Sequence, residues 1–230
     1  MTKLSAWRSF LKIFHLERIP WPGSVIYNAI SGTNIFERHY ELVAQDIVGY
    51  CAEGSILDVG TGPGRLLCIL HKHAPGLQII GLDISHSMVK MAQKNLLNAG
   101  LSDVIEVKEG NSSSIPFGDN SFDSIVSTGS IHHWKDPVAG LNDIYRVLKS
   151  GGYAHIYDLV SDTPSSVLKE ITSEFGRFRM ILLWLHAFEE PFLSYEHFES
   201  LARNTQFKES KSRFVGALFC LTMRKGIEES

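Results

Sequence analysis

A glycine-rich turn between two apolar runs constrains the fold of this chain more than any other feature. Residues 55–66 read SILDVGTGPGRL, so an apolar run contains Asp58 near its end and leads into a turn with three alternate glycines. A second apolar run, residues 77–82, is followed by another acid, Asp83. This pattern predicts a strand–turn–helix–strand unit. Its turn lets a ligand lie against the backbone, and the acid at the tip of the second strand is placed to bind a ribose diol.

The remainder of the chain continues the alternation of strand and helix patterns. We expect strands at residues 55–59, 78–82, 104–109, 124–128 and 153–160, and helices at 64–73, 87–98, 137–148 and 195–203. Ser194 is the predicted N-cap of the last helix. Two final extended runs, 206–213 and 215–223, predict a terminal antiparallel hairpin. Strands that alternate with helices indicate an α/β fold with a mostly parallel sheet.

Composition excludes several classes of protein. The 230 residues are 44% hydrophobic and 20% charged, which suits one well-cored domain, and the net charge of −3 argues against a surface that coats nucleic acid. No apolar run is long enough to span a membrane, and no secretory signal is evident. Cys51, Cys68 and Cys220 are scattered without metal-ligand spacing. We therefore expect reduced thiols, a cytoplasmic location and no metal site.

The spacing of the glycine turn points to one family. A dinucleotide-binding turn requires G-x-G-x-x-G, whereas this chain has G-x-G-x-G with Arg65 at the last position and Asp58 two residues before the first glycine. The turn resembles the (D/E)-x-G-x-G-x-G signature of class I S-adenosylmethionine-dependent methyltransferases. Residues 122–137, FDSIVSTGSIHHWKDP, and 146–152, RVLKSGG, resemble two further motifs of small-molecule methyltransferases, those of ubiquinone and menaquinone biosynthesis among them.

The resemblance implies a fold and an activity. The fold is a three-layer, Rossmann-like α/β structure with a seven-stranded sheet, mostly parallel, whose last strand is antiparallel. The activity is methyl transfer from S-adenosyl-L-methionine to an O, N, S or C nucleophile of a small molecule, with S-adenosyl-L-homocysteine as product. Two alternatives stay open: a protein that binds S-adenosylmethionine without methyltransferase activity, and transfer of a group other than methyl. A nicotinamide oxidoreductase is disfavoured by Arg65 and the terminal hairpin.

The resemblance also assigns cofactor-binding residues. The turn contributes Gly60, Thr61, Gly62 and Gly64, whose backbone would meet the amino-acid carboxylate of the cofactor. Asp58 is expected to meet its ammonium group. Asp83 would bind the ribose hydroxyls, and Ile84 and Met88 would flank the adenine. The other cofactor-binding candidates are Asn111, Ser112 and Thr128. Residues 110–117 read GNSSSIPF where similar enzymes have an acid, so Asn111 either accepts from the adenine amine, donates to a ring nitrogen, or is an ordinary loop residue.

Two adjacent histidines are the candidate catalytic bases. His133 and, second, His132 follow the fourth strand, at the sheet edge where α/β proteins bind ligands. In the alternative interpretation one packs on the cofactor and the other caps the next helix, while metal binding lacks a third ligand. Tyr27 is the third candidate catalytic residue. It lies in a YNAIS segment that resembles a segment placing a tyrosine over the cofactor pocket.

The domain layout follows from what surrounds these motifs. We expect residues 51–160 and 194–230 to form the cofactor-binding core, residues 1–50 an N-terminal helical lid, and the aromatic-rich residues 161–193 an inserted helical substrate cap. Residues 4–18 carry an apolar stripe at helical spacing within a basic segment. This stripe either closes over the site or contacts an anionic membrane surface. The expected partner is a small-molecule acceptor, not nucleic acid.

Overall fold

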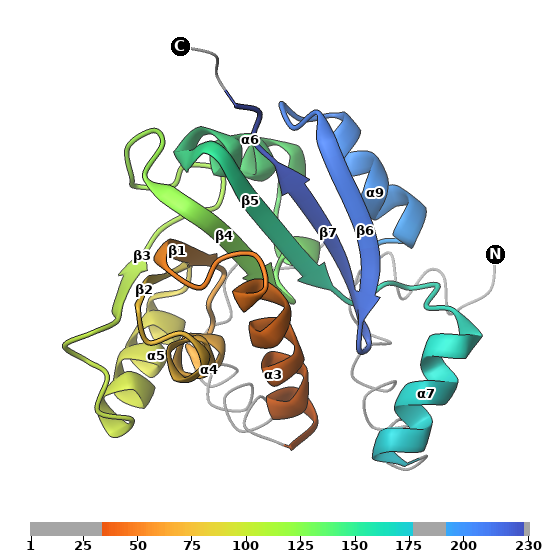
Figure 1. Ribbon diagram of the computed structural model, residues 1–230, viewed down its shortest axis with the longest axis horizontal. Helices are drawn as coiled ribbons and strands as arrows, with labels where there is room; N and C mark the ends of the chain where they lie inside the picture. The colour runs from red at the N-terminus through yellow and green to blue at the C-terminus, as the bar shows by residue number, and fades with distance from the viewer. Residues whose placement is uncertain (1–33, 177–191, 228–230) are drawn as a thin grey trace.

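A seven-stranded sheet forms the centre of the molecule (Figure 1). The computed structural model describes residues 34–176 and 192–227. In sheet order the strands are β3 (Glu106–Glu109), β2 (Leu77–Asp83), β1 (Gly54–Val59), β4 (Phe122–Thr128), β5 (Leu148–Asp158), β7 (Leu218–Arg224) and β6 (Glu209–Val215). The sheet is parallel except for β7, which runs antiparallel to both β5 and β6. The predicted fold class is confirmed.

Helices cover both faces of the sheet because the central strands are apolar on both sides. On one face pack α3 (Asn34–Val48), α4 (Arg65–His73) and α5 (His86–Asn98), whose apolar side chains share one core with the strands. On the other face pack α6 (Pro137–Val147) and α9 (Tyr195–Arg203). Ser194 caps α9, as predicted, by accepting a hydrogen bond from the His197 backbone N–H. The described residues contain no helix that is long and apolar enough to cross a membrane.

The packing of α3 differs from the expected lid over residues 1–50. Val43, Ala44 and Ile47 are fully buried in the core that α3 shares with α4. Asp46 accepts a hydrogen bond from the Tyr157 hydroxyl on β5 and pairs with Arg213 on β6. These contacts attach α3 to the sheet, so residues 34–48 belong to the core. Residues 1–33 of the expected lid, which include residues 4–18 and Tyr27, lie outside the described residues.

The start of β5 differs from the sequence prediction for a local reason. Strand β5 begins at Leu148, because Ser150, Gly151 and Gly152 continue the strand where the sequence suggests a turn. Gly151 has φ of 78°, and the pairing of β4 with β5 shifts register between Phe122 and Ser124, so the segment is an irregular strand. In the expected cap over residues 161–193, the described part contains helix α7 (Ser165–Phe175).

Candidate functional site

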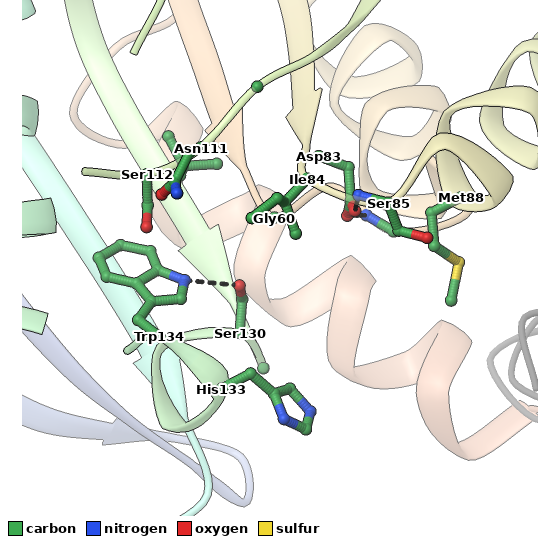
Figure 2. Close-up of a pocket in the computed structure, with 14 residues that line it drawn as sticks. Gly60, Asp83, Ile84, Ser85, Met88, Asn111, Ser112, Ser130, His133 and Trp134 are labelled. Atoms are coloured by element: carbon green, nitrogen blue, oxygen red, sulfur yellow. Dashed lines mark hydrogen bonds between the residues drawn. The ribbon is translucent and has the colours of Figure 1, made fainter. Parts of the chain in front are cut away.

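A pocket opens at the carboxyl ends of β1, β2 and β4 (Figure 2). This is the edge at which parallel α/β sheets bind ligands. Figure 2 shows Asp83, Ile84, Ser85 and Met88 on one side of the pocket, and Ser130, His133 and Trp134 on the other. The structure brings eight of the predicted site residues to its lining: Gly60, Gly62, Asp83, Ile84, Met88, Asn111, Ser112 and His133.

The glycine turn is shaped by contacts that leave no room for a side chain. The backbone N–H groups of Gly60 and Thr61 both donate to the Leu82 carbonyl, at 2.7 and 3.0 Å, and so fix the turn to the end of β2. Gly60 has φ of 79°, and a Cβ at this position would lie 2.0 Å from the Ser130 hydroxyl oxygen. Only glycine fits there, which brings the backbone of β1 and the loop after β4 into direct contact.

The carboxyl of Asp58 is buried beneath this turn with one oxygen unsatisfied. Its Oδ2 accepts a hydrogen bond from the Thr61 hydroxyl at 2.7 Å, whereas Oδ1 meets no hydrogen-bond partner among the described residues. Burial raises the pKa of Asp58 to about 7, and the nearby Asp83 charge adds to the rise, while the Thr61 hydrogen bond opposes it. An unpaired buried carboxylate is costly, so this position favours a cationic or hydrogen-donating ligand.

Asp83 is held in place by the backbone on both of its oxygens. Oδ2 accepts from the Gly62 N–H and Oδ1 from the Ser85 N–H, each at 2.8 Å. Burial raises the pKa of Asp83, and these two hydrogen bonds lower it in part. A carboxylate oxygen accepts more than one hydrogen bond, so Asp83 retains capacity for a diol in the pocket. The turn and the acid are therefore one hydrogen-bonded unit.

The loop after β3 supplies the third wall of the pocket. The side-chain carbonyl of Asn111 accepts from the Ser113 backbone N–H at 2.9 Å. One of its lone pairs is therefore used inside the loop, and its amide group is the better-placed donor to a ring nitrogen. Of the alternatives for Asn111, this geometry favours donation by the amide.

The opposite wall comes from the loop between β4 and α6. The 3-10 helix η1 (Ile131–His133) presents His133 to the pocket, and the Trp134 indole N–H donates to the Ser130 hydroxyl at 2.9 Å. The indole also packs on Gly140 of α6, where a Cβ would lie 2.6 Å from the ring. This contact fixes the indole plane against the pocket.

The imidazole of His132 contacts the His133 ring, with centroids 4.0 Å apart, and pairs with Asp158 at the end of β5. Its Nδ1 lies 2.7 Å from Oδ2 of Asp158, and the side chains are 7% and 3% exposed. The same oxygen accepts from the His132 backbone N–H at 3.3 Å, and Oδ1 accepts from the Leu159 N–H at 2.8 Å. The Phe192 ring packs against the imidazole, with centroids 4.6 Å apart. His132 thus belongs to a buried pair behind the pocket lining.

Five predicted site residues stand outside the lining, and Tyr27 lies outside the described residues. Those five are Asp58, Thr61, Gly64, Thr128 and His132. Gly64 is the N-cap of α4 at φ 72°, where a Cβ would lie 3.0 Å from Cβ of Ala92, so its role here is packing. Among the described residues no group of three or more histidine, cysteine, aspartate or glutamate side chains could hold a metal ion.

The structure adds lining residues that the sequence reasoning did not select. They are Val59, Ser85, Gly110, Gly129, Ser130 and Trp134. Ser130 and Trp134 lie within the FDSIVSTGSIHHWKDP segment, but their hydrogen bond to one another gives no signal in the sequence. Gly110 approaches Leu82 so closely that a Cβ would lie 2.6 Å from its Cδ1.

Comparisons with known proteins agree with this geometry. Residues 57–156 match the methyltransferase domain family. A demethylmenaquinone methyltransferase of Bacteroides fragilis is 35% identical over 106 residues, which are 46% of this chain and 43% of that protein. A ubiquinone/menaquinone biosynthesis C-methyltransferase of Geotalea daltonii is 33% identical over 57% of this chain and 56% of its own length. The matched region thus spans less than two thirds of either relative.

A solved structure extends the likeness to most of the chain. A protein of Methanococcus maripaludis, described as an S-adenosylmethionine-dependent methyltransferase, is 27% identical, with a TM-score of 0.70 over 90% of this chain and 94% of its own. The predicted resemblance to class I S-adenosylmethionine-dependent methyltransferases is confirmed. Within that class, the chain resembles the methyltransferases of ubiquinone and menaquinone biosynthesis.

Proposed function

We propose that this protein transfers a methyl group from S-adenosyl-L-methionine to a quinone-type small molecule in its reduced, hydroquinone form. The observation that carries the proposal is the joined unit of Asp83 and the Gly60–Gly62 turn, with the unsatisfied Oδ1 of Asp58 beneath it. These groups offer an acceptor for a ribose diol, backbone donors for a carboxylate and an anion for an ammonium group. S-adenosylmethionine carries all three.

Each part of the cofactor has a residue suited to hold it. Asp83 would accept from the ribose hydroxyls, Asp58 would face the ammonium group, and the side chains of Ile84 and Met88 would flank the adenine, whose ring nitrogen would meet Asn111. When bound, the cofactor supplies an activated methyl group on a cationic sulfur. The task of the protein is then to align the acceptor with that methyl group and to exclude water.

The names of the relatives support a quinone-type acceptor. The Bacteroides fragilis relative acts on demethylmenaquinone, and the Geotalea daltonii relative is named a C-methyltransferase of ubiquinone and menaquinone biosynthesis. On the wall opposite Asp83, Trp134 and His133 offer planar surfaces that suit an aromatic ring. Carbon is therefore the accepting atom that we propose.

We further propose that residues 161–193 cover the acceptor side of the pocket. Support comes from Phe192, at the end of that segment, whose ring packs on His132 beside the pocket. A covered site would keep water away from the reacting atoms. Removal of the cover would be expected to raise the KM for the acceptor more than the Kd for the cofactor.

Binding and product formation test the proposed function separately. Calorimetric titration of the full chain with S-adenosylmethionine and with S-adenosylhomocysteine should show binding of both. Incubation with 1,4-naphthohydroquinone bearing a short prenyl chain, kept reduced, should then yield the methylated ring and S-adenosylhomocysteine by mass spectrometry. Binding without S-adenosylhomocysteine formation would contradict the transfer reaction, whereas absence of binding would contradict the whole proposal.

A further inference from the structure

Ser130 lies where the two walls of the pocket meet. It lines the pocket between β4 and η1, and it approaches Gly60 so closely that a Cβ on that glycine would lie 2.0 Å from the Ser130 Oγ. From the other side, the Trp134 indole N–H donates to the same oxygen at 2.9 Å (Figure 2). Ser130 therefore contacts both the glycine turn proposed for the cofactor and the aromatic wall proposed for the acceptor.

The Ser130 hydroxyl retains its hydrogen for a ligand. A hydroxyl group donates one hydrogen bond and accepts up to two. The bond from Trp134 uses a lone pair, and Ser130 makes no side-chain capping bond although it is the N-cap residue of η1. Within residues 34–176 and 192–227, the bond from Trp134 is the only hydrogen bond that this side chain makes. The O–H is thus a donor at the lining of the pocket.

We infer that the Ser130 hydroxyl donates a hydrogen bond to a ring oxygen of the acceptor and so selects oxygen-bearing rings, an inference that rests on the proposed function. The Trp134 N–H fixes the position of Oγ and polarises the O–H group, because hydrogen bonds in a chain strengthen one another. Ser130 is therefore a specificity-determining residue, and Trp134 is a positioning residue that acts through it. The oxygens of hydroquinones and quinones accept such a bond, whereas the parent hydrocarbon has no acceptor.

The arrangement of the wall favours the acceptor as the partner of this hydroxyl. An indole N–H lies in the plane of its ring, so the Ser130 Oγ sits at the edge of the Trp134 plane. A planar ring stacked on the indole at about 3.5 Å would bring a substituent on its edge within hydrogen-bond reach of Oγ. The ribose and ammonium groups of the cofactor are donors, and they are matched by the carboxylates of Asp83 and Asp58. A hydroxyl that offers a hydrogen suits the acceptor oxygen instead.

A matched pair of ligands tests the inference without turnover. In calorimetric titrations with S-adenosylhomocysteine bound, the wild-type protein should bind 2,3-dimethyl-1,4-naphthoquinone, which has no free position to methylate on its quinone ring, more tightly than 2,3-dimethylnaphthalene, which lacks both oxygens. In S130A the Kd of the quinone should rise about five- to tenfold, as expected for one hydrogen bond. The Kd values of the hydrocarbon and of S-adenosylmethionine should not change. S102A, at an exposed serine, should behave as wild type.

Variants of Trp134 give a second test, which remains available if S130A does not fold. W134F keeps an aromatic ring and removes the N–H, so it should lower the preference for the quinone over the hydrocarbon by about two- to fivefold. The double variant S130A/W134F should show no further loss of this preference beyond S130A, because Trp134 acts through Ser130. A loss of packing alone would weaken the binding of both ligands equally. Circular dichroism establishes that each variant is folded.

The outcomes separate the inference from the proposed function. An unchanged preference for the quinone in S130A or in W134F would overturn the inference. So would weaker binding of S-adenosylmethionine in S130A, because Ser130 would then serve the cofactor. A wild-type protein that binds S-adenosylmethionine but not the quinone would overturn the quinone-type acceptor of the proposed function, and one that does not bind S-adenosylmethionine would overturn that function as a whole.

Discussion

The two walls of the pocket are built in different ways. On the cofactor side, Asp83 binds the backbone of Gly62 and of Ser85, and all three residues lie in one strand–turn–helix–strand unit. On the opposite side, Trp134 donates to Ser130, and behind this wall His132 is fixed by Asp158 and packs against Phe192, which lies 60 residues further along the chain. The first wall is formed by residues that lie close together in the sequence and is held by backbone hydrogen bonds. The second depends on side chains that the sheet brings together.

The largest effect should follow from a change in the cofactor wall. In G60A the added Cβ would lie 2.0 Å from the Ser130 hydroxyl oxygen in a backbone conformation that disfavours side chains. We expect the Kd for S-adenosylmethionine, measured by calorimetry, to rise more than about 100-fold. G118A is the matched control, because the nearest atom lies 3.8 Å away.

The double variant G60A/S130A identifies the cause of that loss. It removes the contact with the Ser130 hydroxyl oxygen, while Cβ of residue 130, at 2.6 Å, and the backbone strain remain, so cofactor binding should return only in small part. Thermal unfolding should show both variants folded at the assay temperature. Normal cofactor affinity in G60A would contradict the role given to this turn.

A smaller effect is expected in D83N. The Asn amide can accept through one atom only, so either the Gly62 or the Ser85 N–H loses its partner, and the ribose loses an acceptor. One or two lost hydrogen bonds to a charged group correspond to about 10- to 100-fold weaker binding. Both S-adenosylmethionine and 5′-methylthioadenosine, which keeps the ribose, should be affected in calorimetric titrations, and D103N should affect neither. If 5′-methylthioadenosine bound D83N normally, the ribose assignment would be wrong.

The pKa of Asp58 predicts a pH-dependent affinity. Burial holds this pKa near 7, and only the ionised carboxyl attracts the ammonium group. As pH falls below about 7, wild-type affinity for S-adenosylmethionine should drop by up to about 10-fold per pH unit. D58N should lose that dependence and bind about 10-fold more weakly at pH 8. Binding of 5′-methylthioadenosine, which lacks the ammonium group, serves as the control and should be insensitive to the variant.

The same pKa affects stability with a defined sign. The carboxyl binds its proton more tightly in the folded protein than in the unfolded chain, where the pKa is near 3.8, so stability should fall as pH rises from about 4 to 7. D58N should therefore unfold at a higher temperature than wild type at pH 8, and the difference should shrink at pH 4. Equal melting temperatures of D58N and wild type at pH 8 would contradict the raised pKa of the Asp58 carboxyl.

The smallest effect concerns the acceptor wall. W134F keeps an aromatic ring on Gly140 and removes the indole N–H that donates to Ser130. We expect a KM for the hydroquinone acceptor raised by about two- to fivefold, with cofactor affinity unchanged, because a single neutral, part-buried hydrogen bond contributes about 1 kcal/mol. A larger change in cofactor affinity than in KM would show that this wall also serves the cofactor.

The difference between the walls matches what could be predicted from the sequence. The succession of strands and helices along the chain, the turn and Asp83 follow from local apolar runs and glycine spacing, and the structure has them close to the expected positions except at the start of β5. The contact between the His132 imidazole and the Asp158 carboxylate could not be predicted from the sequence, because it depends on how the ends of β4 and β5 align. Likewise, the sequence of α3 does not indicate that Asp46 accepts a hydrogen bond from the Tyr157 hydroxyl on β5.

The position of β7 gives the sheet an assembly order. Asp158 pairs with Phe219 in the β5–β7 ladder, and β6 pairs with β7 alone among the described strands. While the chain is being synthesised, the outer edge of β5 therefore stays open until residues 218–224 have emerged, and β6 has no neighbour to join. The cofactor wall can form early, but the strand end that carries Asp158 is completed last. An open edge of this kind is prone to aggregation, so truncation within β7 should yield insoluble protein.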